Sequence, residues 1–172
     1  MAVDWMGRYR DVVAALVRHG NAIARTQFNR NEIYPDISLT HQEWQVLEYI
    51  IEHTSDDSNM IQISERLAIP QSSFSKVSKL LHEHRLIAKY RVFGNRKNVV
   101  LKATAFGEEV YRYHSKVIHN AVFSQFFQDL NDLSDQDLAQ FAQAIERMDS
   151  KILSFSEKQP AKELIRIETE ER

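Results

Sequence analysis

The sequence has no cysteine, only four glycines and only three prolines among its 172 residues. Without cysteine the chain forms no disulfide bond, offers no thiolate to a metal ion and has no thiol for redox sensing. The scarcity of glycine and proline favours long helices over many short strands. No apolar run approaches the roughly 18 residues of a membrane span, and Asp4 stands where a secretory signal carries basic residues. We therefore expect a mainly helical protein of the cytoplasm, with no membrane association.

A strongly basic segment stands out in a chain whose net charge is −2. Residues 70–102 contain eight lysines and arginines but a single acidic residue, Glu83, so the segment carries about +7 and the remainder about −9. A basic patch on an otherwise acidic protein is typical of a surface that binds a polyanion. Because the segment reads as a helix followed by a hairpin, the pattern indicates duplex DNA. The cations are Lys76, Lys79, Arg85, Lys89, Arg91, Arg96, Lys97 and Lys102.

Two short helices joined by a turn precede the hairpin. The first is predicted over residues 60–67, after a polar run at 54–59 that supplies its N-cap. Pro70 ends the turn, where its missing N–H has no helical partner to lose. The second helix, predicted over 71–84, has one apolar face and one short polar face with cations, as a helix lying in a major groove requires. The apolar face carries Phe74, Val77 and Leu81, and the polar face carries Ser72, Ser75, Lys76 and Lys79.

The pattern then changes from helix to strand. Residues 88–93 read as a strand, and residues 94–98 contain the glycine and asparagines that tolerate positive φ in a turn. Residues 99–103 read as the returning strand. The sequence therefore predicts a β-hairpin next to the basic helix, with Arg96 and Lys97 in its turn.

Amphipathic helices flank this central region. A helix over residues 3–30 carries an apolar stripe that it cannot bury alone, so it must pack on a distant segment or on a second subunit. Thr40 and Glu43 form a capping box that opens another helix. On the C-terminal side, Thr104 caps a helix that is predicted to reach about Leu130. The inward residues of the helix after Thr40 are predicted to be Trp44, Leu47, Ile50 and Ile51.

A last helix is predicted to open at Ser134. Its apolar residues recur at helical spacing and are Leu138, Phe141, Ile145, Met148 and Ile152.

This order of elements resembles the MarR family of winged helix-turn-helix transcriptional regulators. Thr104 and Gly107 are in register with the Leu-Thr-x-x-Gly segment that follows the wing in that family. The resemblance implies a mainly α fold with a small β-hairpin wing, in which the winged helix-turn-helix is flanked by N- and C-terminal dimerisation helices. It spans residues 8–153 and rests on segments 39–47, 68–77, 80–87 and 101–108.

The resemblance also implies a function and a division of the chain. Members of the family are triangular homodimers whose winged regions reach successive grooves of a pseudo-palindromic DNA site. They typically repress genes until a small anionic or phenolic effector releases them. The expected parts are a dimerisation helix at 1–38, the DNA-binding region at 39–104, dimerisation helices at 105–155 and a charged, mobile tail at 156–172. The expected DNA-binding residues are Gln71, Ser72, Ser73, Ser75, Lys76, Lys79, Asn95, Arg96 and Lys97.

The chain departs from the family pattern at two positions. Pro70 replaces the serine or threonine that often caps the recognition helix, and Gly94 and Asn95 stand where an acid commonly braces the wing arginine, here Arg96. These departures support an alternative interpretation, in which the winged helix is a protein-interaction or small-molecule-binding module without specific DNA binding.

Other chemistries find less support in the sequence. Some members of the family sense zinc through histidines at i, i+4 on the first long C-terminal helix, but His114 and His119 are five residues apart and lie on different faces. A site that joins His114 with His41 and Glu43 stays an alternative to our expectation of no metal and no cofactor. The aromatic residues around Trp44 and Tyr111 either pack in the core or line an effector pocket. No catalytic motif is present, so we expect no enzyme.

Overall fold

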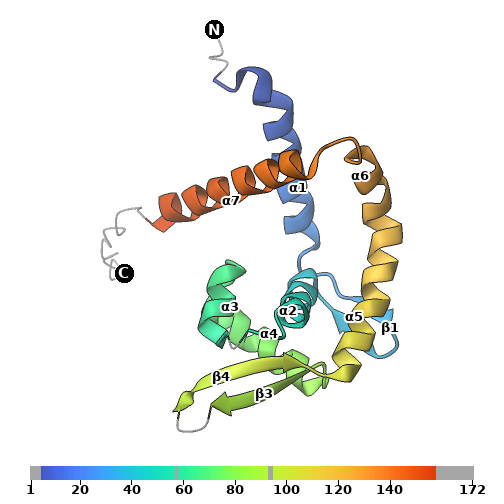
Figure 1. Cartoon of the computed structure of the whole chain (residues 1–172), viewed down its shortest axis with the longest axis vertical. Helices are drawn as coiled ribbons and strands as arrows, with labels where there is room; N and C mark the ends of the chain where they lie inside the picture. Colours follow the sequence, from blue (N-terminus) through green and yellow to red (C-terminus); the bar gives the residue numbers. More distant parts are fainter. Residues whose placement is uncertain (1–4, 57, 93–94, 158–172) are drawn as a thin grey trace, which may run out of the picture. The chain divides into compact units, whose positions relative to one another are not determined.

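The computed structural model describes the chain except for residues 1–4, 57, 93–94 and 158–172, and it leaves the side chains of residues 92, 95–98 and 156–157 undescribed as well. The chain divides into two compact units, residues 1–122 and 123–172. The fold is mainly α-helical with small antiparallel strand pairs, as predicted (Figure 1). The tail predicted beyond Ser156 lies outside the described residues from residue 158 onward.

The first unit contains the helix-turn-helix and the wing. A 3₁₀ turn precedes the first helix, and a π-helical turn follows the fifth. In chain order its elements are the turn Gly7–Tyr9, α1 (Arg10–Thr26), β1 (Asn31–Tyr34), β2 (Ile37–Leu39), α2 (His41–Glu52), α3 (Met60–Arg66), α4 (Gln71–Glu83), β3 (Ile87–Val92), β4 (Asn95–Ala103), α5 (Ala105–Ile118) and the π-helical turn His119–Phe123.

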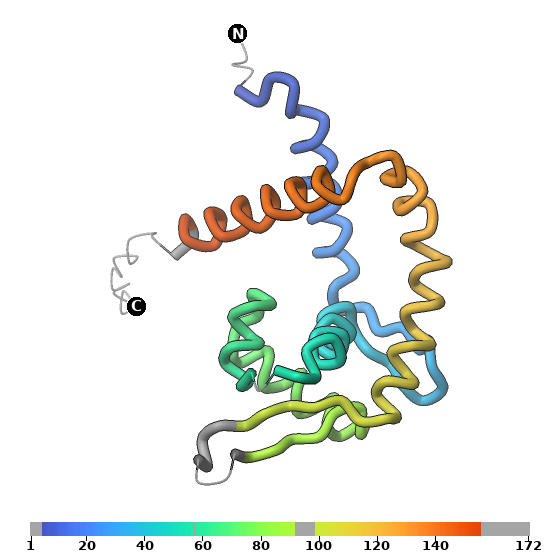
Figure 2. The backbone as a smooth tube through the Cα atoms, viewed as in Figure 1, coloured from blue at the N-terminus to red at the C-terminus, as the bar shows by residue number. Residues whose placement is uncertain are grey.

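The core of the first unit lies between α2, α3, α4 and the β3–β4 hairpin, which Figure 2 shows as one group. Most residues predicted to point inward on α2 and α4 are buried, including Trp44 and Leu47 on α2 and Phe74 and Leu81 on α4, whereas Ile51 is only half-buried. The capping box predicted for α2 is present: Glu43 N–H donates to Thr40 Oγ1 (3.3 Å) and Thr40 N–H donates to Glu43 Oε2 (2.8 Å).

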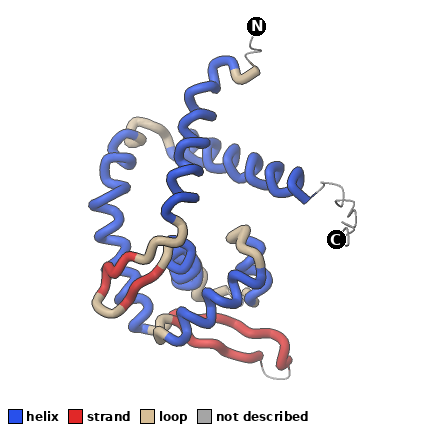
Figure 3. The backbone as a smooth tube through the Cα atoms, turned by 180° about the vertical axis from the view of Figure 1, so that it is seen from behind, coloured by secondary structure: helices blue, strands red, loops and turns tan. Residues whose placement is uncertain are grey.

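A second strand pair, β1–β2, was not predicted from the sequence. Figure 3 shows it in red, apart from the wing hairpin. The turn between its strands holds Asp36 at φ 63°, and Ile37 and Leu39 of β2 are buried. The three residues of β2 are too few to show the period-2 pattern by which a strand is recognised in a sequence. The hairpin is instead stabilised by the burial of Ile37 and Leu39 against the core.

The other boundaries differ from the predictions in three places. The first helix is shorter than residues 3–30, because a turn follows Thr26 and leads into β1. The returning strand of the wing begins at Asn95 rather than at Val99, since the register shifts after Arg91 and Val92 then pairs with Asn95. The helix after Thr104 reaches Asp129, close to the predicted Leu130, but its middle turn, His119–Phe123, is π-helical.

The second unit contains α6 (Ser124–Asp129) and α7 (Asp135–Glu157). Ser134 opens α7 as predicted, because Asp137 N–H donates to Ser134 Oγ (3.2 Å) and Ser134 Oγ donates to Asp137 Oδ2 (2.6 Å). The apolar residues of α7 recur at helical spacing, and no residue of this unit whose side chain the structure describes is buried. The large exposed ones are Val122 at the boundary, Phe123, Phe126, Phe127, Leu133, Leu138, Phe141, Met148, Ile152, Leu153 and Phe155.

Candidate nucleic-acid interface

The polar face of α4 is exposed along its length. Phe74 and Val77 are buried on the other face, with exposed fractions of 1% and 6%. This helix therefore shows the two faces that the sequence predicted. Of the residues expected to contact DNA, Gln71, Ser72, Ser75, Lys76 and Lys79 are exposed and Ser73 is half-buried.

The start of α4 has no side-chain cap. Pro70 occupies the N-cap position, and its carbonyl accepts from the N–H groups of Ser73 and Phe74, each at 2.9 Å. The preceding turn holds Ala68 at φ 52°, a left-handed conformation that glycine adopts more easily than alanine. The first turn of α4 therefore exposes serine side chains, and no side chain caps its N-terminus.

Lys79 is close to the only acidic residue of the basic segment. Its Nζ lies 3.8 Å from Glu83 Oε1, one helical turn further on, and both side chains are exposed. An exposed pair of this kind contributes little to stability and breaks readily. Lys79 can therefore exchange Glu83 for a phosphate without a large energetic cost.

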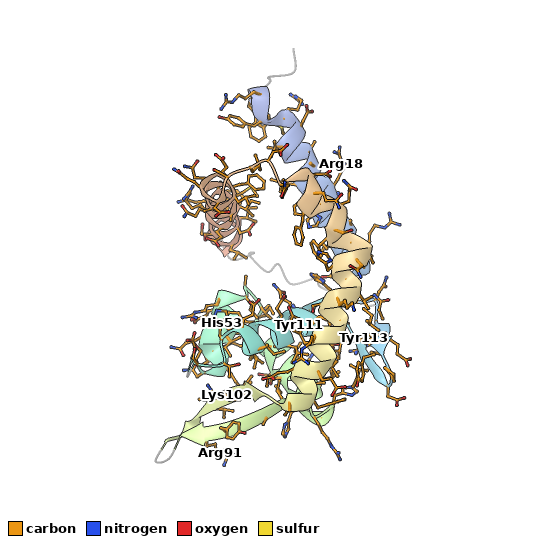
Figure 4. The ribbon with its side chains drawn as sticks, turned by 45° about the vertical axis from the view of Figure 1, so that its right-hand side comes forward. Arg18, His53, Arg91, Lys102, Tyr111 and Tyr113 are labelled. Atoms are coloured by element: carbon orange, nitrogen blue, oxygen red, sulfur yellow. The ribbon has the colours of Figure 1, made fainter. Side chains whose placement is uncertain are left out.

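The wing adds cations beside α4. Lys89 and Arg91 are exposed on β3, with exposed Tyr90 between them, and Figure 4 labels Arg91 on the hairpin. The backbone of residues 95–97 belongs to β4. The side chains of Asn95, Arg96 and Lys97, which the sequence predicts as wing contacts, lie outside the described set.

Lys102 differs from Lys76, Lys79, Lys89 and Arg91, whose side chains are exposed. Its Nζ donates to the backbone carbonyls of Thr54 (2.5 Å) and Asp56 (3.1 Å), in the turn that follows α2. Sequence analysis grouped this lysine with the cations of the DNA-facing surface. No pattern in the sequence distinguishes it, because its partners lie more than forty residues away in the chain.

Two contacts between α2 and α5 involve ionisable residues. The rings of Trp44 and His114 stack at 3.7 Å with an interplanar angle of 12°. Trp44 Nε1 and His114 Nδ1 are buried and have no hydrogen-bond partner among the described residues. Burial, and secondarily the nearby His41, lowers the pKa of His114 to about 4. Tyr111 donates to Glu48, and its burial raises the pKa of this phenol above its usual value.

The described residues contain no group of three or more histidine, aspartate or glutamate side chains placed to hold a metal ion. Glu43, considered above as a ligand together with His41 and His114, instead accepts from Arg30 (Oε1 to NH2, 2.7 Å) and from the Thr40 N–H. Within the described part of the chain, no helix has the length and apolar character needed to cross a bilayer.

Comparisons by sequence and by structure give different results. No protein-family model matches the chain, and no curated protein sequence matches it significantly.

Solved structures do match along most of the chain. Streptococcus pneumoniae FabT in complex with DNA is 17% identical, with a TM-score of 0.56 over 86% of this chain and 99% of FabT. Streptomyces coelicolor PcaV, a transcriptional regulator in complex with its natural ligand, is 21% identical, with a TM-score of 0.56 over 87% of this chain and 97% of PcaV. Staphylococcus aureus MarR in complex with salicylate and kanamycin is 17% identical, with a TM-score of 0.58 over 87% of this chain and 95% of that protein.

Proposed function

From its fold, which is that of the MarR family of transcriptional regulators, we infer that this chain is a sequence-specific DNA-binding regulator. We place it in the cytoplasm as a homodimeric repressor that a small aromatic or anionic effector releases from DNA. The observation that carries the proposal is the exposed serine- and lysine-bearing face of α4 beside the exposed cations of β3. A helix of this kind fits a major groove, while the adjacent hairpin reaches the neighbouring backbone or minor groove.

The neighbouring structures support the proposed partners by analogy. FabT was solved with DNA, PcaV with its natural ligand and the staphylococcal MarR with salicylate. A DNA partner is also consistent with the charge distribution, since the basic segment lies in a chain of net charge −2. The absence of a catalytic motif agrees with a regulator that acts by binding.

The proposed homodimer has support from exposed apolar surface. None of the seventeen residues of α1, all of which are described, is buried. A helix whose apolar stripe stays at most half-buried among the described residues favours a partner surface. Two copies joined through such helices would present two α4 helices to half-sites about one helical turn of DNA apart.

The proposal is tested by selecting genomic DNA fragments that bind the purified full-length protein at two salt concentrations. We expect one short inverted repeat to be enriched, with an affinity that falls steeply as salt rises because phosphate contacts release counterions. Gln71→Ala should weaken binding mainly at one base position, and Arg96→Ala combined with Lys97→Ala should weaken binding to all sequences.

Two results would contradict the proposal. Salt-dependent binding with no enriched sequence would indicate a nonspecific DNA-binding protein. No binding at either salt concentration would favour the protein-interaction or small-molecule-binding module, for which the uncapped start of α4 at Pro70 is the structural argument.

A further inference from the structure

The backbone of Lys102 is part of the wing strand β4, while its side chain contacts the turn that follows α2. Its strand, β4, pairs with β3 through Ala88 opposite Lys102. Its Nζ lies 2.5 Å from the carbonyl oxygen of Thr54 and 3.1 Å from that of Asp56. Figure 4 shows Lys102 on the hairpin, on the same side of the first unit as His53 at the end of α2.

The ammonium group of Lys102 binds backbone atoms of the protein itself. Thr54 and Asp56 lie in the turn after α2, which ends at Glu52, and backbone carbonyls outside a helix or strand take their donors from elsewhere in the chain or from water. An ammonium that donates to two of them forms charge-assisted hydrogen bonds. A lysine held in this way lies in the basic segment without being directed to a DNA phosphate.

The loop that receives Lys102 is also held by α3. Arg66, the last residue of α3, lies 3.6 Å from Asp56 Oδ2 and donates to the hydroxyl of Tyr49 on α2 at 2.7 Å. Asn59, the N-cap of α3, forms an isolated β-bridge with Val100 of β4. The wing and α3 therefore meet at the same loop.

This loop joins α2 to α3 and accepts hydrogen bonds from Lys102 of β4, so it links the wing to the α3–α4 pair. The helix α3 packs on α4, and β4 packs on both α2 and α3. A shift of β4 relative to Thr54 and Asp56 would change the position of the wing relative to α4. Simultaneous contact of two elements with adjacent grooves tolerates little misplacement.

We propose that Lys102 is a positioning residue for DNA recognition: it fixes the wing relative to the α3–α4 pair and makes no contact with DNA. The inference rests on the proposed function, because it assigns a role within DNA binding. It separates Lys102 from exposed cations such as Lys89, which occupies the partner strand of the same hairpin.

A positioning lysine and a phosphate-contacting lysine leave different signatures. Loss of one phosphate contact weakens binding to every sequence and lowers the slope of log affinity against log salt by about 0.9. Loss of a positioning residue weakens binding to the specific site, leaves nonspecific binding unchanged and leaves the salt slope unchanged.

The test measures specific and nonspecific DNA affinity over a salt series for full-length variants. Lys102→Met keeps the length and apolar stem of the side chain but removes the donors. We expect it to weaken specific binding about tenfold, as loss of charge-assisted hydrogen bonds does, with an unchanged salt slope. Lys102→Arg restores donors and should recover most of the affinity. Lys89→Met is the matched control and should lower the salt slope instead.

A second measurement does not depend on DNA. Amide hydrogen exchange of the free protein should be faster in Lys102→Met at the 54–59 loop and along residues 99–103, and unchanged in Lys89→Met. Faster exchange in a protein that selects no DNA sequence would overturn the proposed function while retaining Lys102 as the link between wing and loop. Unchanged exchange, or a lowered salt slope in Lys102→Met, would overturn the present inference.

Discussion

Two glycines show how differently the same residue type is used in this chain. Gly107 lies in the first turn of α5, where an added Cβ would be 2.0 Å from the carbonyl oxygen of Leu86. That oxygen also accepts from the Thr104 N–H at 3.0 Å, so α5 begins in direct contact with the turn between α4 and β3. Gly20, inside α1, has no atom within 4 Å of an added Cβ. The first glycine is required by a close approach of two backbones, and the second is not.

This contrast predicts opposite effects of the same substitution. Gly107→Ala should lower the free energy of unfolding by roughly 1–3 kcal/mol or more, because the new methyl group meets a backbone atom that cannot rotate away. Gly20→Ala should raise the free energy of unfolding by about 0.5–1 kcal/mol, since alanine favours a helix interior. Urea denaturation of both variants measures the two changes. Equal effects of the same sign would contradict the proposed role of Gly107.

At the scale of elements, the contact between α2 and α5 determines how the winged region meets the helix that leaves it. It combines the stacked rings of Trp44 and His114 with the hydrogen bond from Tyr111 to Glu48. On the opposite side of α5, Tyr34 of β1 donates to Glu109 at 2.7 Å and packs edge-on against Phe106 and Tyr113. The helix α5 is thus held by polar and aromatic contacts from α2 and β1. One of these contacts, the stack of His114 on Trp44, includes a group that titrates.

The titrating contact predicts a pH-dependent stability. The pKa of His114 is about 4 in the folded chain, lowered by burial and then by His41, against roughly 6.5 when unfolded. Above pH 6.5 both states are neutral at this residue and it has no effect. As the pH falls from about 6.5 to about 4, the unfolded chain gains a proton that the folded chain does not, so stability is lost over this window.

The variant His114→Phe keeps a ring to stack on Trp44 but cannot titrate. Its free energy of unfolding, measured in urea at several pH values between 7.5 and 4.5, should fall less steeply with decreasing pH than that of the original protein. The two slopes of unfolding free energy against pH should differ by no more than the value for one bound proton. Parallel curves for the two proteins would show that His114 does not titrate differently in the folded state.

At the scale of the whole molecule, α1 and the second unit each carry large apolar residues that are exposed in a single copy of the chain. On α1 they include Tyr9, Val12 and Val17, and Trp5 lies just before it. In the second unit, Phe123 stacks on Phe127 with 5.6 Å between ring centroids, yet both remain exposed. A second copy is the simplest partner for these exposed apolar residues, because an isologous contact covers the same patch on both subunits.

The proposed dimer predicts a face-specific effect of charge on α1. Val12 and Asn21 are nine residues apart and lie on opposite sides of the helix. Val12→Glu should raise the dimer dissociation constant by at least roughly a hundredfold, because a buried carboxylate would lack a partner. Asn21→Glu adds the same charge on the other side and should leave association unchanged. Sedimentation equilibrium separates the cases, and three proteins with the same mass in solution would exclude α1 from the interface.

The sequence by itself determined the elements whose hydrogen bonds close over a few residues. The capping pair of Thr40 and Glu43, the opening of α7 at Ser134, and the apolar face of α4 were all predicted, and the structure confirms each of them. Their partners lie three or four residues away, so local spacing contains the necessary information. The expected division into dimerisation and DNA-binding parts, and the individual DNA contacts, stay predictions.

Only the tertiary structure decided the contacts between residues distant in the chain. It formed the β1–β2 hairpin, used the basic Lys102 inside the protein, and paired Arg30 with the nearly buried Glu43. It also placed Gly107 against Leu86, where the sequence showed only a glycine in register with a family segment. The physical reason is the same in each case: a side chain's partner is set by which elements pack together, and charge or propensity at one position does not specify the element that packing will bring to it.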